Sequence, residues 1–246
     1  MTWFLQHRFK ILLASLLAVL VLLPVIVDFA GEVDRRAKAL LVFGFTSLFL
    51  LAGTLVVSDR RATFRTALGL LIPLLLFGTL ARFLEPGRWI VLDHLLRMGF
   101  QVFVVVVLLG YLFRAGFVTL DIVSASLCVY LALGVFWENV YSILETLRPG
   151  SIVVVDAAQA RTGGPESDLS RTMEMLYFSF ATLTSLGYGD IVPKTSSARM
   201  FAVAEALTGQ LYLVVMVSRL VSMYGTQAFA LPVSSEPASK QEDVGT

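Results

Sequence analysis

Long apolar runs without charged residues alternate with short polar stretches along most of the chain. A bilayer core about 30 Å thick requires roughly 20 mostly apolar residues in a helix, with about 17 as the lower limit. Helix is also the only open-ended structure that satisfies its own backbone in lipid. The pattern therefore predicts six transmembrane helices. The first four lie over Ile11–Val27, Ala39–Ser58, Thr66–Ala81 and Met98–Phe113, and the fifth and sixth lie within the interrupted runs Ala115–Leu147 and Ala198–Tyr224.

Three of these runs need a comment on where they begin or end. The third must extend into Leu84 to cross the membrane, and the fourth is expected to begin near Trp89, a residue suited to the interface. The first run is longer than the apolar region of a signal peptide, usually about 7–15 residues. A poor cleavage site, Asp28-Phe29-Ala30, follows it. Both features favour a retained helix over a cleaved signal peptide.

The composition supports a membrane protein and excludes several other classes. Apolar residues make up 57% of the 246 residues and charged residues 15%, against roughly 25% charged in typical globular domains. One cysteine, Cys128, cannot form an internal disulfide, and two histidines, His7 and His94, cannot build a histidine-rich metal centre. A net charge of +1 gives no electrostatic reason to bind nucleic acid. We expect an all-α membrane protein that is not an enzyme and needs no cofactor.

The segment between the fifth and sixth runs differs from the rest of the chain. Its apolar part, Met173–Thr184, is too short to cross the membrane. The sequence Ser185-Leu186-Gly187-Tyr188-Gly189-Asp190 follows directly. A short apolar segment that enters and turns back is a re-entrant helix, and its non-helical tail is tolerated only where it lines an aqueous cavity or is buried in protein. We therefore predict a re-entrant pore helix followed by a selectivity-filter loop.

The Gly-Tyr-Gly sequence suits a backbone that aims its carbonyls at one axis. Such a strand needs alternating conformations, which glycine adopts without steric cost. Four such strands would form stacked carbonyl rings that replace the hydration shell of a potassium ion. Ser185 would add a ring of hydroxyls, the side chain of Tyr188 would point away from the axis, and Asp190 would place negative charge at the outer mouth.

This loop resembles the signature of the potassium channel superfamily, and within it the bacterial channels with a two-helix pore module. Thr182–Asp190 is similar to Thr-x-Thr-Thr-Val-Gly-Tyr-Gly-Asp and departs from it at Ser185 and Leu186. The resemblance covers roughly Phe117–Tyr224. It implies a homotetramer whose filter is formed by Ser185, Leu186, Gly187, Tyr188 and Gly189, with potassium held at the first four of these residues.

Two positions behind the filter differ from other members of that superfamily. Ala181 stands where some carry a carboxylate, and Phe178 stands where some carry a tryptophan that is hydrogen-bonded to the filter tyrosine. The resemblance therefore implies that apolar contacts brace the filter here.

The sixth run contains further candidates for the pore. Gly209 lies mid-helix, where the family often has a hinge; close helix packing is the alternative, because small residues are common at membrane helix interfaces. Gln210, Leu213, Val214 and Val217 share one helical stripe. We expect this stripe to line the cavity, with packing between subunits as the alternative.

Two acids, Glu138 and Glu205, interrupt the fifth and sixth runs. Acids within membrane spans are functional or paired by default. We expect them to tie these two spans together through polar neighbours such as Asn139 or Gln210, rather than to bind ions.

The fourth run lacks the charges of a voltage sensor, which uses about 3–4 arginines per subunit. It carries only Arg97 and Arg114, one near each end. Both are expected to extend toward the headgroups. The sequence therefore predicts a voltage-insensitive channel in which residues 1–114 form a four-helix region of unassigned role.

Residues 115–225 are predicted to form the pore domain, and residues 226–246, rich in polar side chains, a disordered cytoplasmic tail. With the filter facing outward, an even number of spans places both termini in the cytoplasm of a multi-pass protein of the cell membrane. The alternative function is a membrane scaffold or regulatory subunit that retains a channel-like pore fold.

Overall fold

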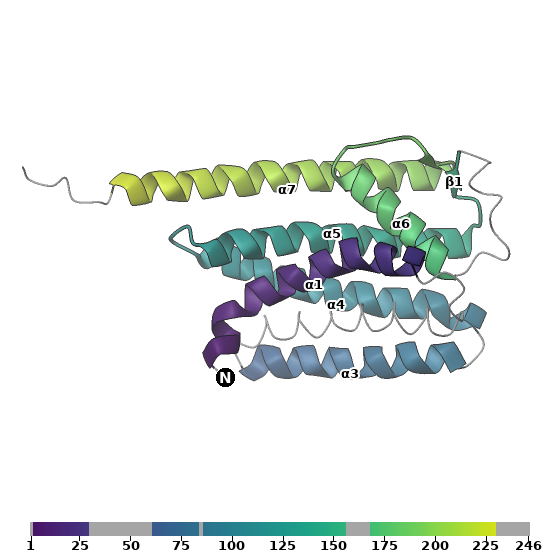
Figure 1. The fold of residues 1–246 in the computed structure, drawn as a ribbon, viewed down its shortest axis with the longest axis horizontal. Helices are drawn as coiled ribbons and strands as arrows, with labels where there is room; N and C mark the ends of the chain where they lie inside the picture. Colours follow the sequence, from purple (N-terminus) through teal and green to yellow (C-terminus); the bar gives the residue numbers. More distant parts are fainter. Residues whose placement is uncertain (1, 30–60, 84–85, 156–167, 230–246) are drawn as a thin grey trace, which may run out of the picture.

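The computed structural model describes residues 2–29, 61–83, 86–155 and 168–229. Within these ranges the chain is a bundle of long helices that run side by side (Figure 1). The all-helical membrane class predicted from the sequence is confirmed. In chain order the elements are α1 (Thr2–Phe29), α3 (Arg61–Phe83), α4 (Pro86–Arg114), α5 (Leu120–Leu147), β1 (Ile152–Val154), α6 (Asp168–Leu183), β2 (Ile191–Pro193) and α7 (Ser196–Phe229).

Three of the described helices are long and apolar enough to cross a membrane: Trp89–Arg114 in α4, Leu120–Leu147 in α5 and Ser196–Gly225 in α7. α1 and α3 contain shorter apolar stretches, Phe9–Leu22 and Arg65–Gly78. The predicted span Ala39–Ser58 lies outside the described residues. The count of six spans therefore stays a prediction.

α5 begins at Leu120, inside the run Ala115–Leu147 that was predicted to hold the fifth span. Thr119 is extended, with φ −127° and ψ 161°, and its hydroxyl accepts a hydrogen bond from the backbone N–H of Ile122 at 3.3 Å. A threonine in this role is a favoured N-cap. The first residues of the apolar run therefore lie in the connection before α5, and the helix begins only after its N-cap.

α5 is the central helix of the described chain, since it contacts α1, α4, α6 and α7 (Figure 1). Toward its N-terminus, buried Ala125, Cys128 and Val129 pack in one apolar cluster with residues of α1 and α4. Toward its C-terminus, Tyr141 packs in a second cluster with residues of β1, α6 and α7. α5 therefore connects the N-terminal helices to β1, α6 and α7, the elements that surround the loop of residues 184–190.

A small antiparallel sheet of two strands joins the two ends of the segment between α5 and α7. β1 pairs with β2, and Val153 lies opposite Val192. The sequence analysis predicted no strand here, because three-residue strands leave no periodic pattern to detect. As a result, the chain between Val155 and Asp190 starts and ends at the same small sheet.

α6 begins at Asp168, five residues before the predicted start at Met173, and ends at Leu183. Its 16 residues span about 24 Å, less than a bilayer core of about 30 Å. Figure 1 shows it running obliquely between α5 and α7, at the end of the bundle that carries β1. This position brings its C-terminus to the face of α7.

Arg219 attaches the C-terminal half of α7 to the end of α4. Its Nη2 donates to the carbonyls of Leu112, Phe113 and Ala115 at 3.0, 2.9 and 3.3 Å. The last carbonyls of a helix lack partners within that helix and carry partial negative charge. The guanidinium therefore satisfies the end of α4 and couples it to α7.

At Gly209, α7 lies close to the last residue of α6. A Cβ built there would lie 2.5 Å from the carbonyl oxygen of Leu183. This contact supports the packing explanation for the glycine, while its role as a hinge stays a prediction.

We predict that Gly209→Ala pushes α7 away from Leu183 and destabilises the folded protein by about 1–3 kcal/mol, the usual effect of overpacking. The midpoint of thermal unfolding in detergent measures this loss. Gly225→Ala is the matched control, because a Cβ there meets nothing within 4 Å on the same helix. Equal midpoints for the two variants would contradict the packing role.

Candidate functional site

A left-handed residue after the end of α6 turns the chain into the loop Ser185–Asp190, the predicted selectivity filter. The N–H of Ser185 donates to the carbonyl of Thr182 at 2.9 Å, and the N–H of Leu186 donates to the carbonyl of Ala181 at 2.8 Å. Ser185 has φ 58°. Together these features form a Schellman termination, in which glycine is the usual left-handed residue. A serine there costs roughly 1–2 kcal/mol.

Two consecutive amides of the loop point back at α6. The N–H groups of Leu186 and Gly187 both donate to the carbonyl of Ala181, at 2.8 and 3.2 Å. In a planar trans peptide, the C=O and the N–H point in opposite directions. The carbonyls of Ser185 and Leu186, which share those two peptide planes, therefore point away from α6.

Positive φ angles recur at every second residue of the loop. They are 58° at Ser185, 56° at Gly187 and 81° at Gly189, while Leu186 and Tyr188 between them have ordinary negative values. The two glycines adopt this conformation without a steric penalty from a Cβ. The alternation matches the backbone conformation expected from the sequence.

All residues from Thr184 to Asp190 are exposed in the single chain. The exposure includes two large apolar or aromatic side chains, Leu186 at 55% and Tyr188 at 69%. By contrast, Phe178 and Ala181 of α6 are buried. In the single chain the loop itself is thus exposed, while these residues of the preceding helix are buried.

A polar contact braces the Asp190 end of the loop, where apolar contacts were expected from the sequence. The hydroxyl of Tyr177 donates to Oδ2 of Asp190 at 2.8 Å, and its ring stacks on Tyr188 with centroids 6.5 Å apart. The backbone N–H of Val155 donates to the carbonyl of Asp190 at 2.7 Å. Phe178 and Ala181 are apolar as expected, but the expectation missed Tyr177.

At the other end of the loop, α7 contacts Ser185. Nε2 of Gln210 donates to Oγ of Ser185 at 3.0 Å. Gln210 and the other members of its stripe, Leu213, Val214 and Val217, are all exposed in the single chain. Gln210, the first residue of the stripe, therefore lies next to Ser185, and the role of the stripe as a cavity lining stays a prediction.

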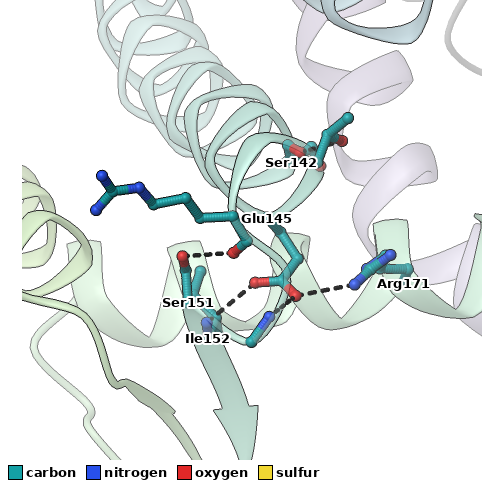
Figure 2. Close-up of polar contacts among 8 residues, drawn as sticks. Ser142, Glu145, Ser151, Ile152 and Arg171 are labelled. Carbon is teal, nitrogen blue, oxygen red and sulfur yellow. Dashed lines mark hydrogen bonds and ion pairs between the residues drawn. The ribbon is translucent and has the colours of Figure 1, made fainter. Parts of the chain in front are cut away.

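Glu145, which the sequence analysis did not single out, joins α5, β1 and α6 (Figure 2). Its Oε1 accepts from the N–H of Gly150 at 2.6 Å and from Nη2 of Arg171 at 2.9 Å, and its Oε2 accepts from the N–H of Ile152 at 3.1 Å. Only 4% of this residue is exposed. A single carboxylate thus fixes the turn after α5 and the first turns of α6.

The hydrogen-bond partners of Glu205 and Glu138 differ from those expected from the sequence. Glu205 accepts from Tyr141 of α5 and contacts Ser179 of α6, so it does connect the fifth and sixth predicted spans, but not through Asn139 or Gln210. Glu138 accepts from Ser142 on its own helix at 2.9 Å.

A polar group on α4 faces α5. Nδ1 of His94 lies 2.7 Å from Oδ1 of Asn139. Arg97 pairs with Asp93 on the same helix at 2.8 Å and its side chain is 16% exposed, while its extension toward the headgroups stays a prediction.

Comparisons of the sequence with known proteins indicate the family of this chain. A family model described as "Ion channel" matches residues 102–225. Two-pore potassium channel 4 of Arabidopsis thaliana is 37% identical over 59 residues, which are 24% of this chain and 20% of that protein. Voltage-gated potassium channel Kch of Escherichia coli (strain K12) is 38% identical over 53 residues, 22% of this chain and 12% of that protein.

A third relative, the human voltage-gated delayed rectifier potassium channel KCNH5, is 43% identical over 49 residues, 20% of this chain and 5% of that protein. The matched part of the chain thus spans a fifth or less of the length of these relatives. No solved structure matches the chain. The family model, in contrast, spans half of the chain and contains α5, the filter loop and most of α7. The chain therefore belongs to the ion channel family.

Proposed function

We propose that four copies of this chain form a potassium-selective, voltage-insensitive channel that conducts ions passively down their gradient. It lies in the cell membrane with both termini on the cytoplasmic side and the filter facing outward. One observation carries the proposal: the carbonyls of Ser185 and Leu186 point away from α6, because the next two amides are bonded to Ala181. Rings of such carbonyls replace the hydration shell of potassium in filters.

The assembly into four follows from the single loop in each chain. One strand offers one carbonyl at each level, and a quarter of a ring cannot dehydrate an ion. The open side of the loop and the exposed apolar side chains of α7 support burial between copies. The larger ones are Met200, Phe201, Val203, Leu207, Leu211, Leu213, Val214, Val215, Val217 and Val221. The mass of the protein in detergent tests this assembly, and a monomer without ion flux would favour the alternative of a scaffold or regulatory subunit.

The names of the relatives support the choice of ion. Each of the three is a potassium channel by name. The backbone pattern at Gly187 and Gly189 is the one that the proposed ion sites require. Asp190 would place a negative charge at the outer mouth, held in position by Tyr177.

We predict that Gly187→Ala abolishes the preference for potassium over sodium while the protein still assembles. The φ of 56° disfavours any residue with a Cβ, although no atom lies within 4 Å of the added carbon. Reversal potentials in mixed sodium and potassium measure the preference, and the mass in detergent checks the assembly. Gly110→Ala on α4 is the control, since it has open space and no positive φ. A Gly187→Ala channel with wild-type reversal potentials would rule out the filter assignment.

We predict a nearly flat dependence of open probability on voltage between about −100 and +100 mV, the range in which sensors respond. Arg97 is paired with Asp93 one turn away on the same helix, so the pair carries no net charge through the field. Arg114 lies at the end of α4. Conductance–voltage curves in symmetric potassium should stay flat after both arginines are neutralised. A steep curve that this double substitution abolishes would restore a voltage sensor.

A further inference from the structure

The carboxyl group of Glu205 lies fully buried where α5, α6 and α7 meet. Its Oε2 is 2.5 Å from the hydroxyl oxygen of Tyr141, and its Oε1 is 2.5 Å from Oγ of Ser179. The same Oγ of Ser179 is 2.8 Å from the carbonyl oxygen of Gly134. Three oxygen–oxygen contacts of hydrogen-bond length thus form one chain from Tyr141 to Gly134.

The number of protons in this chain of contacts shows which form of Glu205 fits. Each contact needs one proton between its two oxygens. Tyr141 and Ser179 carry one hydroxyl proton each, and the carbonyl of Gly134 carries none. The third proton can come only from Glu205. In that form Tyr141 donates to Oε2, the acid donates from Oε1 to Ser179, and Ser179 donates to Gly134.

An ionised Glu205 would leave one contact without a proton. Ser179 could donate to the carboxylate or to Gly134, but not to both. The 2.5 Å distances by themselves fit either form, because a hydroxyl also approaches a carboxylate to about 2.5–2.7 Å. The contact between Ser179 and Gly134 is therefore the one that decides.

The surroundings of Glu205 also disfavour a charge. An isolated carboxylate in an apolar interior is strongly disfavoured unless a cation or several hydrogen-bond donors compensate it. Among the described residues, no Lys, Arg or His forms an ion pair with Glu205. The titratable groups near it are two tyrosines of α5, Tyr141 and Tyr130; on α6 it meets the hydroxyl of Ser179.

We propose that Glu205 is a neutral, proton-carrying acid that positions the pore helix α6 against α5 and α7. Ser179, which it contacts, lies one helical turn before Leu183 and two residues before Ala181, the carbonyl that holds the loop amides. Loss of the proton would break one of the contacts of Ser179 and leave a buried charge. The consequence for conduction rests on the proposed function; the protonation state does not.

Infrared difference spectra between the wild type and Glu205→Gln test the protonation state directly. The wild type at neutral pH should show the C=O band of a protonated carboxylic acid, which shifts in D2O and is absent from the variant. If the variant instead lost carboxylate bands and no protonated C=O band, Glu205 would be ionised in the wild type, and the proposal would be overturned. This readout does not depend on ion conduction, so its failure is distinguishable from failure of the channel assignment.

The same variant gives a second test, because glutamine reproduces the neutral acid. Its carbonyl can accept from Tyr141 and its amide can donate to Ser179. Glu205→Gln should assemble and conduct within about twofold of wild type at neutral pH, since the hydrogen bonds are kept. Wild-type conduction should fall as the pH is raised into the alkaline range, and that of Glu205→Gln should not. Failure of Glu205→Gln to assemble, or an alkaline decline in both proteins, would contradict a neutral acid.

Discussion

Lipid offers no partner to backbone that leaves a helix, so protein groups or water must satisfy the segment that follows α6. The solution begins at Ala181, whose carbonyl accepts two amides from the loop. Those two bonds turn the intervening carbonyls to the opposite side, where another polar species must meet them. The same two bonds therefore fix the first turn of the loop and turn the carbonyls of Ser185 and Leu186 away from α6, as the proposed cation sites require.

α5 carries most of the contacts that keep α6 in place for this purpose. Glu145 holds the turn after α5 and the start of α6, Gly134 accepts from Ser179 in the middle, and Tyr130 donates to the carbonyl of Leu183 at 3.3 Å at the end. A Cβ at Gly134 would meet the ring of Phe180 at 2.6 Å, so the small residue permits this close approach. Contacts with one helix thus hold α6 at its start, its middle and its end.

The features that could be predicted from the sequence are those written in contiguous residues. Long apolar runs identified α4, α5 and α7, because a membrane span imposes its length on the chain. The alternating positive φ at Gly187 and Gly189 was expected from the glycines, and the role of this loop as a filter stays a prediction. The start of α5 inside the run Ala115–Leu147 depends on the capping hydroxyl of Thr119, which a hydropathy pattern does not reveal. The hydrogen bonds of Glu145 and Glu205, and the bond from Tyr177 to Asp190, could not be predicted. Their partners lie far apart in the chain or at spacings that follow no periodic pattern. Such contacts depend on tertiary packing, which a hydropathy pattern does not encode.

The most direct measurement is the location of a heavy alkali ion in the assembled protein. Crystals grown in a rubidium salt would give an anomalous signal wherever the ion replaces potassium. The proposed channel predicts a row of peaks on a fourfold axis, each surrounded by carbonyl oxygens of Ser185, Leu186, Gly187 or Tyr188 from four chains. An assembly without such a fourfold axis, or one whose axis carries no peak at the level of these carbonyls, would contradict it.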